Sequence, residues 1–129
     1  MFRGFFRDGC PRTKIVLVGT QEEEVEAIVD TGFNGFLTLP EEIAKRIGLT
    51  FTNAVISSTI ADGSTSPSLV YSGKIVYDSS RTDILIDVQP NCKILLGTAL
   101  LEEFRLSLFV DIIADRVEFK PTGRVMRLL

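Results

Sequence analysis

An acidic residue at the end of an apolar run is the feature that most constrains this chain. Asp30-Thr31-Gly32 directly follows Ala27-Ile28-Val29. From Glu23 onward polar and apolar residues alternate, until both faces become apolar just before Asp30. This pattern predicts a strand whose far end is buried, and the glycine predicts a tight turn after it. The sequence therefore places a carboxylate where a buried strand meets a loop.

The rest of the chain is predicted to be mostly β-strand. Apolar, β-branched segments alternate with turn residues, and Asp62-Gly63 marks a tight hairpin. Pro40, the basic pair Lys45-Arg46 and Gly48 delimit one helix, and Thr98 is expected to cap a second. The expected strands span 14–18, 23–30, 36–39, 52–60, 68–77, 82–88, 93–96, 105–110 and 116–120, and the expected helices span 41–47 and 99–104.

Length and charge set further limits. With 129 residues the chain is expected to form a single domain, residues 1–129, around one core. A net charge of -3 gives no basic surface for nucleic acid, and no apolar stretch is long enough to span a membrane. The start is a poor signal peptide, so a cytoplasmic location is the default expectation. The segments before Pro11 and after Pro121 are expected to fray or to engage a partner.

Histidine is absent from the sequence. Ser-His-Asp and Cys-His hydrolases need an imidazole as the base, and zinc hydrolases usually need it as a ligand. These classes of hydrolase are therefore excluded. Cys10 and Cys92 are isolated and show neither a redox nor a metal-ligand spacing, so reduced thiols and no metal site are expected.

Three segments together resemble a known family. Residues 29–40 read Val-Asp-Thr-Gly-Phe-Asn-Gly-Phe-Leu-Thr-Leu-Pro. This closely resembles the single-domain, retropepsin-like aspartic proteases of prokaryotes, in particular those in which Phe follows Asp-Thr-Gly. Ile60-Ala61-Asp62-Gly63-Ser64 resembles the tip of the flap hairpin of that family, and residues 94–101 resemble its second apolar segment with the helix that follows. The three segments occur in the family's order and make the resemblance more specific than Asp-Thr-Gly alone.

The resemblance implies an all-β fold, a closed acid-protease β-barrel with two short helices and a flap hairpin, assembled as a homodimer. It implies an aspartic endopeptidase that needs no metal or organic cofactor. Such enzymes use two carboxylates that share one proton. Because this chain has one Asp-Thr-Gly, Asp30 of a second copy has to supply the other carboxylate. An extended peptide or protein substrate would lie between the Asp30 loops and the flaps, with apolar side chains preferred around the cut.

The resemblance also assigns supporting roles. Thr31 is expected to form hydrogen bonds across the dimer axis, Gly32 to donate its N–H toward the carboxylate, and Gly97 to leave room behind the Asp30 loop. Phe33 stands where familiar retropepsins carry Ala or Ser, and it either lines the cleft or packs beneath it. The flap residues expected to contact substrate are Ala61, Asp62, Gly63 and Ser64.

Two other interpretations stay open. In the first, the chain is a catalytically inactive dimeric β-barrel that binds extended peptide segments or acts as a scaffold. In the second, it is a monomeric β-barrel in which Asp30 only satisfies its own turn. Asp62-Gly63 would then be a simple hairpin turn.

Overall fold

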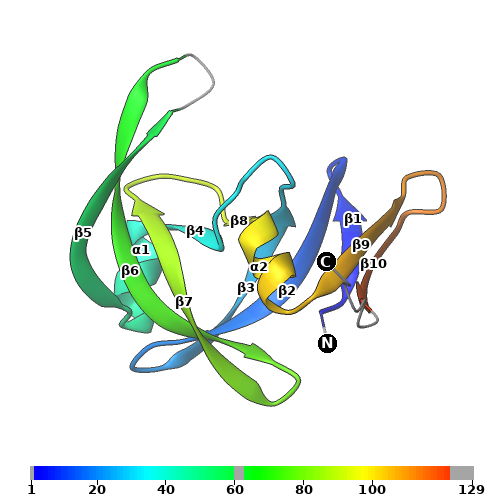
Figure 1. Cartoon of the computed structure of the whole chain (residues 1–129), viewed down its shortest axis with the longest axis horizontal. Coiled ribbons are helices and arrows are strands. Elements are labelled where there is room, and N and C mark those ends of the chain that lie inside the picture. The colour runs from blue at the N-terminus through cyan, green and yellow to red at the C-terminus, as the bar shows by residue number, and fades with distance from the viewer. Residues whose placement is uncertain (1, 60–62, 123–129) are drawn as a thin grey trace, which may run out of the picture.

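The computed structural model describes residues 2–59 and 63–122 and is built mainly of strands (Figure 1). Two short helices, α1 (Glu41–Ile47) and α2 (Thr98–Glu103), interrupt them. The strands are β1 (Gly4–Arg7), β2 (Cys10–Val18), β3 (Glu22–Val29), β4 (Leu37–Pro40), β5 (Thr50–Thr59), β6 (Thr65–Tyr77), β7 (Ser80–Gln89), β8 (Leu95–Leu96), β9 (Leu106–Asp111) and β10 (Arg116–Pro121).

Most of the strands form one sheet that closes on itself. Its order is β1-β2-β3-β8-β4-β7-β6-β5, and β2 also pairs with β6 from Val16↔Val76 to Val18↔Lys74. This second pairing converts the sheet into a closed barrel. The β3–β8 and β4–β7 pairs are parallel, whereas the β1–β2, β2–β3, β5–β6 and β6–β7 pairs are antiparallel. The expected closed, all-β barrel with two short helices is confirmed.

The core follows from the period-two alternation of strand side chains. In β3, for example, Val25, Ala27 and Val29 are buried, while the residues between them are less so. Leu37 of β4, Ile86 of β7 and Leu96 of β8 are fully buried in the same core cluster. In β3, β4 and β7 one face is thus used for packing in the core, and Asp30 follows a strand of this kind.

Helix α1 begins and ends where the sequence predicts. Pro40 is its N-cap residue, and Gly48 ends it with a left-handed φ of 78°. Glycine adopts this conformation without the steric cost of a β-carbon. The expectation of a helix over residues 41–47 is confirmed.

The long β5–β6 hairpin extends beyond the body of the barrel (Figure 1). Residues 60–62 at its tip, including Ala61 and Asp62, lie outside the described residues. Gly63, with a φ of 86°, and Ser64 follow the tip and are exposed. The two strands of the expected hairpin are therefore present, one on each side of residues 60–62.

The expectation of a fraying segment before Pro11 is wrong for residues 4–7. They form β1, which pairs with β2 from Gly4↔Thr13 to Arg7↔Cys10. Asp8 and Gly9, both at positive φ, make the turn between the two strands. An Asp-Gly turn with two positive φ angles matches the twist of a hairpin.

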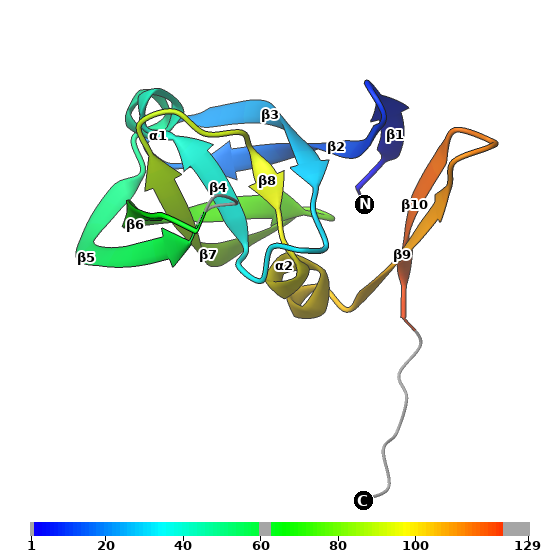
Figure 2. The ribbon, with the colours of Figure 1, turned by 90° about the horizontal axis from the view of Figure 1, so that it is seen from above.

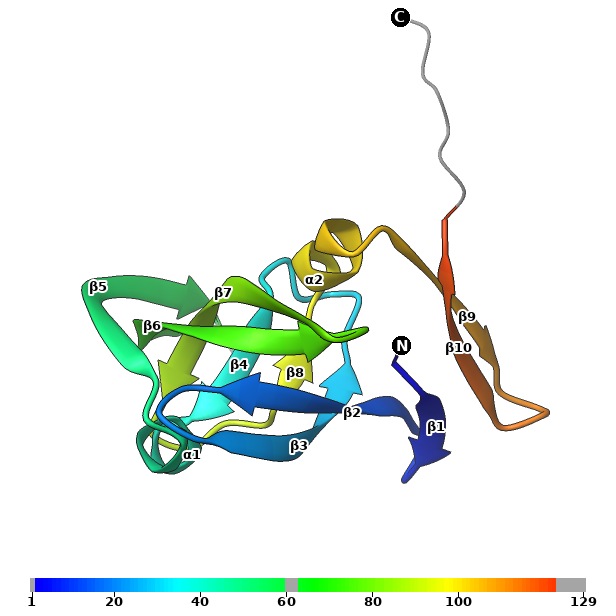
Figure 3. The ribbon, with the colours of Figure 1, turned by 90° about the horizontal axis from the view of Figure 1, so that it is seen from below.

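Strands β9 and β10 form a separate two-stranded sheet, as expected for a closing hairpin. It stands beside the barrel, on the far side of α2 (Figures 2 and 3). The bridge Arg3↔Glu118 connects it to the N-terminal residues. No helix in the described ranges is long and apolar enough to cross a membrane.

Candidate active site

Asp30 continues the line of β3 and is held by main-chain hydrogen bonds. Its N–H donates to the Leu96 carbonyl at 2.9 Å, which extends the β3–β8 ladder by one residue. The Gly32 N–H donates to Asp30 Oδ1 at 2.9 Å, and the Phe33 N–H donates to the Asp30 carbonyl at 3.1 Å. No Lys or Arg among the described residues forms an ion pair with Asp30. The carboxylate is thus fixed in position and left available for chemistry.

The loop after Asp30 is bound to the segment around Gly97. The Gly97 N–H donates to the Phe36 carbonyl at 3.0 Å, and the Thr98 N–H donates to the Phe33 carbonyl at 2.9 Å. A β-carbon at Gly97 would lie 2.1 Å from the Gly35 carbonyl oxygen. Only a glycine fits there without moving the main chain that carries Asp30.

The expectation that Thr98 caps α2 is wrong. The N-cap residue is Gly97, and no side chain caps the helix. The Thr98 hydroxyl instead donates to the Phe33 carbonyl at 3.3 Å, across to the Asp30 loop. Thr98 therefore connects the helix to the loop and does not close the end of the helix.

Phe33 packs beneath the loop. A β-carbon at Gly35 would lie 2.5 Å from Phe33 Cζ, and one at Gly97 would lie 2.6 Å from Phe33 Cδ2. The half-buried ring thus occupies the space that two neighbouring glycines leave open. Of the two positions considered for Phe33, the structure shows the one beneath the loop, and its contribution to substrate binding stays a prediction.

Four of the predicted site residues are exposed, namely Thr31, Gly32, Gly63 and Ser64. Thr31 and Gly32 are exposed at the turn, where a partner could reach Thr31. Gly63 and Ser64 lie at the end of the β5–β6 hairpin, and neither β5 nor β6 is a neighbour of β3 in the sheet. The structure thus brings together Asp30, Gly32, Phe33 and Gly97. It leaves the roles of Thr31 and of the hairpin tip as predictions.

One surface of the barrel, here called the Asp30 face, carries Asp30 opposite the core. Strand alternation puts Ile28 and Asp30 on the face that does not bear Val25, Ala27 and Val29. The strand registers extend this face across the sheet, since paired residues on neighbouring strands point the same way. From β3 to β6 its members are Ile28, Leu95, Thr38, Asp87 and Val70.

Two solved structures resemble this chain. A retropepsin-like aspartic protease from Rickettsia conorii superposes with a TM-score of 0.60 at 21% identity, covering 93% of this chain and 92% of that one. The EIAV protease complexed with the inhibitor HBY-793 gives a TM-score of 0.58 at 14% identity, covering 74% of this chain and 88% of that one. The chain has a retropepsin-like fold. The sequence itself matches no protein-family model and no curated protein.

Within the retropepsin-like fold, Asp87 is a residue of the Asp30 face that the sequence did not single out. It pairs with Thr38 of β4 on one side and with Val70 of β6 on the other. Partial burial raises the pKa of its carboxyl. Burial, with the charge of Asp87 contributing, also raises the pKa of the nearby Cys92 thiol. A partly desolvated acid therefore lies on the same face as the candidate catalytic acid.

This burial predicts that Asp87 destabilises the fold at neutral pH. A raised pKa means that the folded chain holds the proton more tightly than the unfolded chain does, so the free energy of unfolding falls as pH rises through the titration of Asp87. Asp87→Asn is expected to be more stable than the native chain at about pH 7 and to lose this advantage near pH 4. Urea unfolding at both pH values measures the difference, and an equal difference at the two would contradict the assignment.

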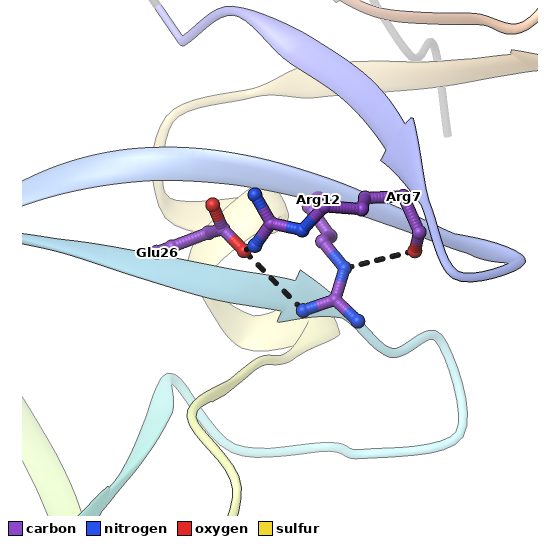
Figure 4. Close-up of polar contacts among 3 residues, drawn as sticks. All are labelled: Arg7, Arg12 and Glu26. Carbon is purple, nitrogen blue, oxygen red and sulfur yellow. Dashed lines mark hydrogen bonds and ion pairs between the residues drawn. The ribbon is translucent and has the colours of Figure 1, made fainter.

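Glu26 organises a small charged cluster on the same strand face. Arg7 and Arg12 both pair with its carboxylate, Arg12 at 3.3 Å, and Arg12 Nε donates to the Arg7 carbonyl at 3.0 Å (Figure 4). The Arg12 and Glu26 side chains are only 17% and 21% exposed. The cluster thereby attaches β1 to β3, although these strands are not neighbours in the sheet.

Glu26→Gln is expected to lower the free energy of unfolding by about 1 kcal/mol, because partly buried charge-assisted hydrogen bonds exceed exposed ones in strength. Urea denaturation measures the loss. Glu24→Gln is the matched control, since Glu24 lies on the same face of β3 and forms no ion pair within the described ranges. A loss of the same size in both variants would argue against a specific role for the cluster.

Proposed function

We propose that this chain is an aspartic endopeptidase that acts as a homodimer, with one Asp30 from each copy. The observation that carries the proposal is the placement of Asp30 in the retropepsin-like fold. It follows the barrel strand β3, Gly32 donates to one of its oxygens, and no cation among the described residues neutralises it.

The proposed reaction is the addition of water to a peptide carbonyl. Two carboxylates in contact cannot easily both ionise, so the pair shares one proton. The ionised carboxylate takes a proton from water as the water oxygen bonds to the carbonyl carbon, and the protonated carboxyl gives its proton to the carbonyl oxygen. In the second step the C–N bond breaks. The now protonated carboxyl gives its proton to the leaving nitrogen, and the other carboxylate takes a proton from a hydroxyl of the tetrahedral intermediate, which becomes the product carboxyl group. Acid and base thereby return to their starting states.

A second copy is required because one chain supplies one Asp30. The exposed Thr31 is proposed to form hydrogen bonds with its counterpart in the partner, which would hold the two loops together. The β5–β6 hairpin is proposed as the flap over an extended peptide, which would bind by main-chain hydrogen bonds like an added strand.

The test is cleavage of a diverse peptide mixture at about pH 4 to 7, the range in which a perturbed dyad acts, together with the solution mass at micromolar concentration. Defined cuts and a dimeric mass are expected. A folded monomer that cuts nothing would contradict both the endopeptidase and the homodimer. A folded dimer that binds peptides without cutting them would favour the inactive binding barrel.

A further inference from the structure

We propose that Asp87 selects a Lys or Arg side chain in the substrate, two to four residues from the bond that is cut. This inference rests on the proposed endopeptidase function and specifies its substrate class. The expected preference for apolar substrate side chains would then apply to the residues next to the cut. It would not apply to the one substrate residue that lies against Asp87.

The first step of the argument is position. The row Ile28, Leu95, Thr38 and Asp87 runs across four neighbouring strands, and Asp30 lies two residues beyond Ile28 on the same face. Three strand spacings of about 4.8 Å and two residues of about 3.3 Å put Asp87 about 16 Å from Asp30. An extended peptide covers that distance in about five residues, and a long cationic side chain shortens it to about three.

The second step concerns the neighbours of Asp87. The Thr38 hydroxyl already donates to the Lys93 carbonyl at 2.7 Å and accepts from the Leu95 N–H at 2.9 Å. Gln89, two residues along β7, donates its side-chain N–H to the Ser68 hydroxyl at 2.8 Å. These polar groups are engaged within the protein. The carboxylate of Asp87, in contrast, forms no ion pair and no hydrogen bond within the part of the chain that the structure describes.

The third step is a comparison with the other acids. Several carboxylates of the barrel pair with Lys or Arg, as Glu23 does with Arg46 and Asp83 with Lys74, whereas the exposed Glu24 forms no ion pair within the described ranges. Asp87 is more enclosed than Asp83, whose side chain is 82% exposed, yet it lacks a cation. A partly desolvated, unpaired carboxylate gains more from a cation than a solvated one does. A substrate Lys or Arg can provide that cation, whereas an apolar or acidic side chain cannot.

The experiment compares peptides that differ only in Lys, Arg, Gln, Leu or Glu at each of the four positions on either side of the cut. The native chain is expected to favour Lys or Arg about tenfold in kcat/KM at one such position. Asp87→Asn should remove this preference while still cutting the Gln and Leu peptides, and Asp87→Lys should shift it toward Glu. Asp83→Asn is the matched control on the same face of β7, and it should retain the native preference.

Binding of the same peptides to the Asp30→Asn chain separates this inference from the proposed function. Cleavage by the native chain without any preference for Lys or Arg would overturn the inference and leave the endopeptidase standing. The Asp30→Asn chain is expected to bind Lys or Arg peptides about tenfold more tightly than the others, and the double variant with Asp87→Asn should lose this difference. That result would support the inference even if the native chain cuts nothing. No cleavage and no preference in binding would overturn both.

Discussion

Asp30→Asn is expected to abolish peptide cleavage while leaving the fold intact. An amide cannot take the proton from the attacking water, and general acid–base groups of this kind contribute about 10² to 10⁴ in rate. The substitution is nearly isosteric, and the side-chain amide oxygen can still accept the Gly32 N–H bond that now measures 2.9 Å. Initial rates on the best peptide, with urea unfolding in parallel, separate a chemical defect from a structural one.

Mixing the two chains tests the shared dyad directly. If each site needs Asp30 from both copies, exchange with an equal amount of Asp30→Asn chain leaves about one quarter of all dimers with two native chains. That is about half of the active dimers that the native chain forms alone, so its activity should fall by about half. A large excess of the variant should abolish the cleavage activity of the native chain almost completely. Activity that is unaffected by the variant, with subunit exchange demonstrated by labelled chains, would show that one Asp30 suffices and would contradict the dimeric mechanism.

Gly97→Ala is expected to lower the free energy of unfolding by about 3 kcal/mol. The added carbon would lie 2.1 Å from the Gly35 carbonyl oxygen and 2.6 Å from the Phe33 ring. The Gly35 carbonyl cannot move away freely because it accepts the Ala99 N–H at 3.2 Å. Any relief therefore displaces the loop that positions Asp30, so activity should fall by more than the loss of folded protein explains.

Gly9→Ala supplies the matched comparison. Gly9 has a φ of 72°, but a β-carbon there would meet no atom within 4 Å. Its substitution carries only the left-handed backbone cost, about 1 kcal/mol, and should leave the activity per folded molecule unchanged. Equal losses at Gly97 and Gly9 would mean that close packing behind the Asp30 loop is not what requires glycine at position 97.

Local signals predicted the elements of the fold well. Pro40 and Gly48 fixed the ends of α1 because each acts on its own backbone dihedrals, whatever surrounds it. The same kind of signal was present for β1, where Asp8 and Gly9 form the turn, but the charged and aromatic start of the chain suggested a loose terminus. Thr98 was misjudged because its hydroxyl bonds to Phe33, which is distant in sequence.

The candidate site was only partly predictable for the same reason. Asp30 and Gly97 belong to short motifs whose residues are close in sequence. In the sequence, Asp87 is an ordinary polar residue between the buried Ile86 and Val88, and alternation alone predicts only that it faces away from the core. Its place on the Asp30 face follows from β8 and β4 lying between β3 and β7, and that order depends on pairings between residues far apart in the chain.

The pairing of β3 with β8 also determines when the site can form during synthesis. Residues 28 and 29 pair with residues 95 and 96, so Asp30 emerges from the ribosome long before the strand that supports it. Closing so long a loop is entropically costly until the surrounding barrel forms. A partly synthesised chain thus contains Asp30 before it contains the strand that positions Asp30. If Asp30 is catalytic, a nascent chain stays inactive at least until β8 has been synthesised.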